Sequence, residues 1–167
     1  MKSNRCVLLT VTNLMGKIIL KGVDKEEVYR FVFGDSREYN KKTDSKNIMK
    51  TFFVGNKYIV LKDGDEEKLY ERLRKIIFVV SRDKSKILGG YTSFNDIKRD
   101  KELDMYTSTR SMNDYLTSGK LIPADKVYLV SGQEGVDLLK KLGYLDEVLK
   151  EIGCYKEEKE EDCGREN

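Results

Sequence analysis

The sequence predicts one α/β domain, with a largely parallel, mixed sheet flanked by helices. Three observations support this fold class. Short apolar runs rich in β-branched residues alternate along the chain with segments of helical periodicity. Several runs are apolar at consecutive positions, which is typical of strands covered by helices on both faces. A chain of 167 residues also has room for one core and little room for a second domain.

Four apolar runs predict the buried strands. The clearest is KIIFVV, because five apolar residues in a row end abruptly at the polar residues Ser81, Arg82 and Asp83. DMYTST (104–109) is read as a further, less apolar strand. The buried strands are expected at residues 6–12, 51–54, 76–80 and 126–130, with Val79, Val80, Leu129 and Val130 in the core.

Capping residues predict where helices begin and end. Asp24 precedes two glutamates and should cap a helix over about 25–34, which Gly34 ends. A second helix should begin near Ser111 and end at Gly119, and a third should follow a glycine-bearing turn near Gly132. A short helix or irregular connection is expected over 69–74, helix or edge strand over 144–153, and loops over 35–47 and 84–104. No internal repeat is evident.

Composition excludes several kinds of chemistry. The chain has no histidine, which excludes Ser-His-Asp and Cys-His catalysis and histidine-ligated zinc. Its three cysteines are an odd number without CxxC spacing, so we expect neither a disulfide framework nor a metal site. No apolar run approaches the ~20 residues that span a bilayer, and no signal peptide is recognised. We therefore expect a cytoplasmic protein that does not bind membranes.

The formal net charge of +3 is unevenly distributed. Seven acidic and three basic side chains lie from Glu151 onward, so residues 1–150 carry +7. The domain is therefore expected over 1–155, followed by an acidic, disordered tail over 156–167. A basic body favours an anionic ligand such as a phosphorylated small molecule or a nucleotide.

Three predicted strand ends carry residues suited to phosphate. In open α/β sheets, ligands bind at the carboxyl ends of strands, where backbone amides and helix N-termini face solvent. A glycine permits close approach of the backbone, and a guanidinium or ammonium group attracts the phosphate charge. The candidate cofactor-binding residues are Gly55, Asn56 and Lys57; Ser81 and Arg82; and Ser131, Gly132, Gln133 and Glu134.

Six segments, taken in order, resemble the dihydrofolate reductase-like superfamily, most closely the riboflavin-pathway pyrimidine reductases. They are LTVTNLMGKI, DKEEVYRF, TFFVGNKYIVLKD, KIIFVVSRD, DMYTSTRSMNDYL and KVYLVSGQEGVDLLKKLGYLDEV, and the resemblance covers residue 5 to about residue 150. The resemblance implies a dihydrofolate reductase-like fold and an NADPH-dependent reductase of a pyrimidine or pterin-like substrate. Ser81 and Arg82 would then meet the 2′-phosphate of NADPH.

The same resemblance implies two substrate contacts. Glu27 matches the helix carboxylate that binds the pteridine ring, where it would hydrogen-bond the N–H groups of an aminopyrimidine and support protonation beside the hydride acceptor. We therefore take Glu27 as the candidate catalytic residue. Lys17 matches the lysine of the DGK segment and would meet a substrate phosphate.

Three departures from the family pattern keep other functions open. Ser131 stands where the family has the first glycine of a Gly-Gly pair that lies against the cofactor. Met15 replaces the aspartate of the SLDGK segment, and an acidic tail replaces the C-terminal β-hairpin. The alternatives are a non-catalytic nucleotide-binding or interaction protein of the same fold and, less favoured, a nucleic-acid-binding protein. A homodimer is also compatible with the sequence.

Overall fold

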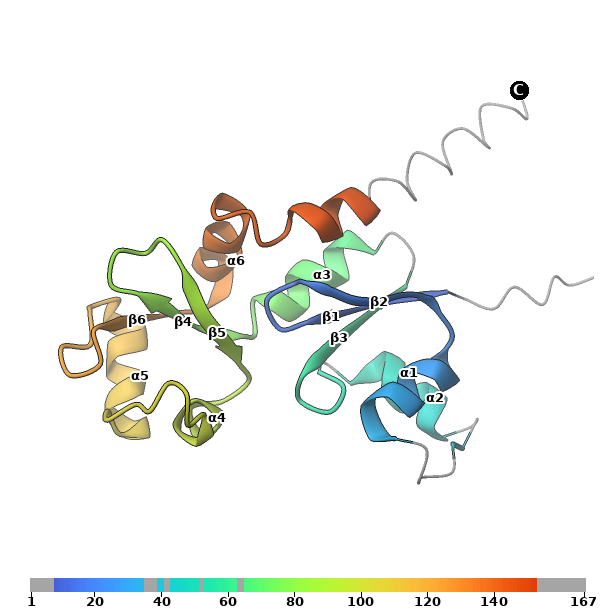
Figure 1. Ribbon diagram of the computed structural model, residues 1–167, viewed down its shortest axis with the longest axis horizontal. Helices are drawn as coiled ribbons and strands as arrows, with labels where there is room; N and C mark the ends of the chain where they lie inside the picture. Colours follow the sequence, from blue (N-terminus) through green and yellow to red (C-terminus); the bar gives the residue numbers. More distant parts are fainter. Residues whose placement is uncertain (1–7, 35–38, 41–42, 52, 63–64, 153–167) are drawn as a thin grey trace, which may run out of the picture. The chain divides into compact units, whose positions relative to one another are not determined.

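A computed structural model describes residues 8–34, 39–40, 43–51, 53–62 and 65–152 (Figure 1). The chain divides into two compact units. Unit 1 comprises Met1–Leu69 with Leu145–Asn167, and unit 2 comprises Tyr70–Tyr144. The elements in chain order are β1 (Leu9–Asn13), β2 (Ile18–Val23), α1 (Lys25–Phe33), α2 (Thr43–Lys50), β3 (Tyr58–Lys62), α3 (Glu66–Leu73), β4 (Ile77–Ser81), β5 (Ile87–Tyr91), α4 (Phe94–Arg99), α5 (Thr109–Ser118), β6 (Val127–Val130) and α6 (Gly132–Lys141).

Unit 1 contains a three-stranded sheet in the order β2-β1-β3, with β1 antiparallel to both neighbours. β1 and β2 form a hairpin whose turn is fixed by Asn13, since its Oδ1 accepts hydrogen bonds from the amides of Met15 and Lys17, both at 2.9 Å. Leu9 and Val11 of β1 belong to one core cluster with residues of α1 and α2. β2 and β3 are the edges of this sheet.

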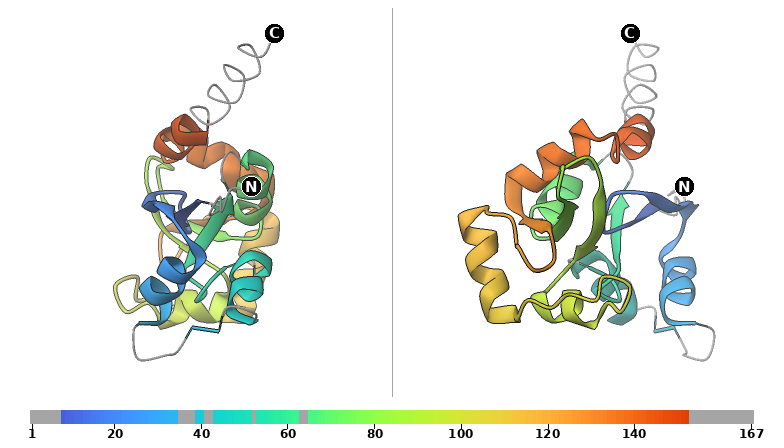
Figure 2. Two further views of the ribbon diagram at one scale, coloured as in Figure 1. Left: turned by 90° about the vertical axis from the view of Figure 1, so that its right-hand side faces the viewer. Right: turned by 60° about the vertical axis from the view of Figure 1, so that its left-hand side comes forward.

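Unit 2 contains a second three-stranded sheet, in the order β5-β4-β6, again antiparallel throughout. Ile97 of α4 and Met112 of α5 share a core cluster with Val79 of β4. α6 lies on the other face of this sheet (Figures 1 and 2). It packs so closely that a Cβ added to Gly135 would lie 2.8 Å from the Phe78 ring. β4 is thus covered by helices on both faces, which explains its continuous apolar run.

The expected fold is wrong. The described residues form two small antiparallel sheets and no large parallel sheet, so the fold is not dihydrofolate reductase-like. A fully apolar run indicates a strand covered on both faces, and this is true of antiparallel as well as parallel strands when helices lie on both sides. Connection length identifies only the hairpins, because a parallel crossover needs a dozen or more residues and the turn from Ser81 to Ile87 is far shorter. β4 and β6 are antiparallel across a long connection, because the unpredicted strand β5 reverses the chain between them.

Sequence reasoning missed mainly β2 and β5, the second strands of the two hairpins. The 76–80 strand and its core residues Val79 and Val80 are confirmed. The expected loop over 84–104 contains β5 and α4, and the short segment after Gly16 is the start of β2.

Two expected strands are absent from their predicted places. Val54 forms only an isolated bridge with Tyr58, and the strand begins at Tyr58. Residues 104–109 lead into α5, which Ser108 caps instead of Ser111. The final segment, from 146 to 152, is helical. The predicted acidic tail over 156–167 lies outside the described residues, and the prediction of a single domain stays a prediction.

The two units repeat one topology. Each has a hairpin, two helices and a third strand beside the first, and in each the first strand is central. A further helix follows the third strand both times, although the first of these, α3, crosses the boundary between the units at Leu69. The registers also match: Thr10 pairs with Leu61 as Phe78 pairs with Val130. Matching positions lie 68 or 69 residues apart in the chain. The structure therefore contains an internal repeat that the sequence does not make evident.

Candidate functional site

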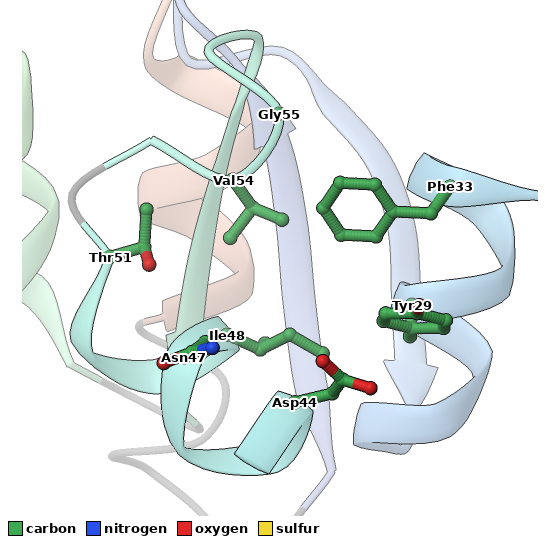
Figure 3. A pocket seen from close by; sticks show the side chains of 8 residues that line it. All are labelled: Tyr29, Phe33, Asp44, Asn47, Ile48, Thr51, Val54 and Gly55. Atoms are coloured by element: carbon green, nitrogen blue, oxygen red, sulfur yellow. The ribbon is translucent and has the colours of Figure 1, made fainter. Parts of the chain in front are cut away.

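A pocket of about 250 Å³ lies in unit 1 (Figure 3). It is formed by α1, α2 and the residues that precede β3. Its volume is slightly below the range of about 300–1,000 Å³ that is common for ligand pockets, and it therefore suits one small ring system. The lining residues are Tyr29, Phe33, Asp44, Asn47, Ile48, Thr51, Val54 and Gly55.

α1 supplies the aromatic wall of the pocket. Asp24 caps this helix through a 2.9 Å hydrogen bond from the Glu27 amide, and Gly34 ends it. Tyr29 and Phe33 are four residues apart and therefore share a face of the helix. Their ring centroids are 5.0 Å apart, and Tyr39 adds a third ring 5.3 Å from Tyr29. Figure 3 shows the Phe33 ring facing Val54 across the pocket.

α2 supplies the polar wall. Asp44, Asn47, Ile48 and Thr51 follow the i, i+3, i+4, i+7 spacing of one helix face. Asp44 is half-buried, and its Oδ2 accepts a 2.7 Å hydrogen bond from the backbone N–H of Asn40. The Oδ1 of Asp44, the side-chain amide of Asn47 and the Thr51 hydroxyl make no hydrogen bond to another residue that the structure describes. These three groups are therefore available to a ligand.

Gly55 closes the pocket next to Val54. Its φ of +61° is a left-handed conformation that favours glycine, and an added Cβ would lie 2.7 Å from Cγ1 of Val32. Gly55 belonged to the predicted cofactor site, and it is the member of that set that lines this pocket. Its role here is to keep the turn close to α1.

The pocket attracts hydrogen-bond donors. Among the described residues that line it, Asp44 alone carries a charge, and none is basic. A phosphate inside the pocket would face a carboxylate without a compensating cation. A planar ring with N–H groups would instead pack on Tyr29 and Phe33 and donate to the open oxygen of Asp44.

The other residues predicted for the cofactor lie elsewhere. Asn56 and Lys57 are exposed and precede β3, so they stand at its amino end. Because β4 and β6 are antiparallel, Ser81 pairs with Val127, and the turn at Ser131 lies at the opposite end of the sheet. The structure therefore does not bring the Ser81 turn and the Ser131 turn together at one edge.

The β4–β5 turn uses its hydroxyl groups internally. The Ser81 and Ser85 hydroxyls donate to Asp83 at 2.8 and 2.7 Å, and the Ser85 amide donates at 3.0 Å. Hydrogen bonds from Ser85 and then Ser81 lower the pKa of Asp83 to about 2. Arg82 is exposed beside this turn.

At the start of α6, Gln133 is also engaged within unit 2. It accepts from Nε of Arg74 at 2.9 Å and donates to Asp137 at 2.9 Å. Ser131 is the N-cap residue of α6 but makes no side-chain capping hydrogen bond, Gly132 has a φ of +66°, and Glu134 is exposed.

The two predicted substrate contacts are on the surface of unit 1. Glu27 is exposed in the first turn of α1 and does not line the pocket, although Tyr29 of the same helix does. Lys17 is exposed at the end of the β1–β2 turn, where its amide bonds Asn13. Their catalytic and substrate-binding roles stay predictions.

Sequence reasoning missed the residues of α2. TDSKNIMK has few apolar residues and follows a polar stretch, so its sequence predicts a loop up to residue 47. The available signal was the spacing of Asp44, Asn47, Ile48 and Thr51, which is that of a helix face with a single apolar member. Tyr29 and Phe33 could have been recognised by their four-residue spacing.

Comparison with protein-family models, curated proteins and solved structures finds no match to this chain. Within the described ranges, no three acidic or cysteine side chains gather as they would around a metal ion. No helix in the same ranges is long and apolar enough to cross a membrane.

Proposed function

We propose that this protein binds a small, planar nitrogen heterocycle, such as a nucleobase or pterin-like ring, in the pocket of unit 1. One observation carries the proposal: the half-buried Asp44 carboxylate keeps an open oxygen beside the aromatic side chains of Tyr29 and Phe33. The carboxylate would select rings with N–H groups, and the aromatic side chains would contact the ring itself.

Known magnitudes are consistent with moderate affinity. Stacking of a base on an aromatic side chain contributes about 1–3 kcal/mol, and a hydrogen bond to a charged group contributes about 1.5–3 kcal/mol. Any phosphate on the ligand would lie outside the pocket, where the basic surface of the chain is the more favourable environment.

The proposal retains part of the function expected from the sequence. The pyrimidine or pterin-like ligand and the nucleotide-binding alternative are kept, with Asp44 in the role that Glu27 was expected to fill. Reduction with NADPH rested on the resemblance to dihydrofolate reductases. It stays a prediction from that resemblance, and neither sheet of the structure adds support to it.

Calorimetric titration tests the proposal. We expect 2,4-diaminopyrimidine or a nucleoside with an amino-substituted base to bind the wild-type chain. Asp44→Asn should weaken that binding about 10- to 100-fold, because the charge-assisted hydrogen bond is lost.

Glu27→Gln is the matched control, since it neutralises a carboxylate on the surface of the same unit. Its affinity should equal that of the wild type. Weakening by Glu27→Gln but not by Asp44→Asn would overturn the proposed pocket and support the role expected for Glu27. Absence of binding by every probe would overturn the proposed function.

A further inference from the structure

The helix face that carries Asp44 has a counterpart in unit 2. α2 ends at Lys50, four residues before Val54, and α5 ends at Ser118, four residues before Ile122. Val54 and Ile122 each form an isolated antiparallel bridge to the start of the strand that follows. This shared geometry aligns the two helices residue by residue. The faces that correspond are Asp44, Asn47, Ile48 and Thr51 in unit 1 and Met112, Tyr115, Leu116 and Gly119 in unit 2.

In unit 2 this helix face is part of the core. Met112 is 0% exposed and belongs to the cluster with Val79 and Ile97, and Tyr115 and Leu116 pack against that cluster. In unit 1, Ile48 alone keeps an apolar side chain on the corresponding face, and it is buried. Asp44 replaces the buried Met112, and Asn47 replaces the half-buried Tyr115, whereas Thr51 corresponds to Gly119, the exposed C-cap of α5. Asn47 and Thr51 are themselves exposed.

Comparison of the two units therefore shows which pocket residues the fold does not require. The same topology and strand register exist in unit 2 with methionine and tyrosine at these positions. Neither a carboxylate at 44 nor an amide at 47 is required to form the fold. Asp44 is a half-buried polar group at the position of a core residue, and its open oxygen favours a ligand over packing. Asn47 is exposed and lines the same pocket.

We propose that Asp44 and Asn47 determine the specificity of the pocket by reading one edge of the bound ring, an inference that rests on the proposed function. Asp44 accepts from an exocyclic amino group, while the side-chain amide of Asn47 donates to the neighbouring ring nitrogen. This pair matches a 4-amino ring such as cytosine, or the corresponding edge of adenine. A 4-oxo ring such as uracil presents an acceptor to Asp44 in the orientation that cytosine adopts. It can donate N3–H to Asp44 only after a shift along its edge, which displaces the ribose of a nucleoside.

Ligand discrimination is the first test. Cytidine should bind the wild-type chain at least tenfold more tightly than uridine, because uridine either leaves its carbonyl facing a carboxylate or must displace its ribose to donate N3–H. Asp44→Asn should remove this preference, since an amide can serve a donor or an acceptor. Equal affinity for both nucleosides in the wild type would leave the proposed function standing and overturn the specificity inference.

Exchange of residues between the units is the second test. Asp44→Met places the unit 2 residue in unit 1, so it should raise the melting temperature while abolishing cytidine binding. Asp114→Met, at an exposed position of α5, is the matched control and should give no such rise. A fall in melting temperature for Asp44→Met would show that the two helix faces are not equivalent and would overturn the inference. Failure of both nucleosides and 2,4-diaminopyrimidine to bind the wild type would identify the proposed function itself as wrong.

Discussion

Two aspartates differ in how many hydrogen bonds their carboxylates accept. Asp125 in unit 2 accepts several, whereas Asp44 in unit 1 keeps one oxygen without a partner among the described residues. Asp125 accepts from the amides of Tyr106 and Thr107 at 2.8 and 3.1 Å and from the Thr107 hydroxyl at 2.5 Å. Burial raises the pKa of Asp125, but these hydrogen bonds outweigh burial and the net shift is downward. Asp44 accepts only from Asn40 among the described residues. Saturation with partners therefore marks Asp125 as a structural residue.

Acid should destabilise the protein through such carboxylates. The pKa values of Asp83, Asp100 and Asp125 are all lowered by hydrogen bonds in the folded state. The unfolded chain then binds protons more readily below the ordinary aspartate pKa of about 3.9, so stability is full above it and falls as pH drops toward 2. Melting temperatures between pH 7 and pH 2.5 measure this loss.

Asp125→Asn should isolate one contribution to the acid effect. At pH 7 we expect it to lower the free energy of unfolding by about 1.5–3 kcal/mol, the range for hydrogen bonds to a charged group. It should also lose less stability on acidification than the wild type. Asp114→Asn, an exposed site on α5, is the control and should behave like the wild type. A variant with unchanged acid sensitivity would show that Asp125 does not contribute to it.

At the scale of single elements, local chemistry was predictable and strand pairing was not. Asp24, Gly34 and Gly119 were assigned correctly as helix ends, because capping depends on a few adjacent residues. The core residues of β4 and β6 were also predictable, because burial follows from unbroken apolar runs. β5 was missed because ILGGY contains two glycines and belongs to an edge strand, where the apolar signal is weak.

Gly135 illustrates packing that only the structure reveals. It is buried in α6, and an added Cβ would lie 2.8 and 3.0 Å from two carbons of the Phe78 ring. Phe78 is fully buried, so the ring has little room to move. We expect Gly135→Ala to lower the free energy of unfolding by about 1–3 kcal/mol through overpacking, although alanine favours helix.

Urea denaturation checks this expectation. Glu134→Ala, at the neighbouring exposed position, should change stability by less than about 0.5 kcal/mol. If Gly135→Ala proved stabilising, helix propensity would outweigh the contact and α6 would not pack on β4 as tightly as described.

For the whole molecule, the repeat shows that 167 residues accommodate two units, each with its own sheet and its own core cluster. The single domain expected from the length stays a prediction. The candidate site could not be predicted from the sequence either. Asp44 stands out only when its position in α2 is compared with the corresponding position of α5, where unit 2 has Met112. Such a comparison requires the strand register, which no local pattern supplies.

Unit 2 should fold alone. Its three strands and the residues of its core cluster all fall between Tyr70 and Tyr144. A fragment of residues 66–144, which keeps α3 whole, should show dispersed amide resonances and a cooperative thermal transition. An unfolded fragment, together with one transition in the full chain, would instead support the single domain expected from the sequence.

The open edges of the two sheets bear on how this chain behaves at high concentration. β2 and β5 are edge strands within the described sheets, and each exposes one large apolar side chain, Ile19 at 37% and Leu88 at 40%. An unpaired strand with apolar side chains is a template for association with another copy. Lys17 precedes β2 and Lys86 precedes β5, while Lys21 on β2 forms an ion pair with Glu151 at 3.8 Å. Repulsion between the Lys17 and Lys86 side chains of different copies opposes edge-to-edge pairing, so solubility should decline as salt screens these two lysines.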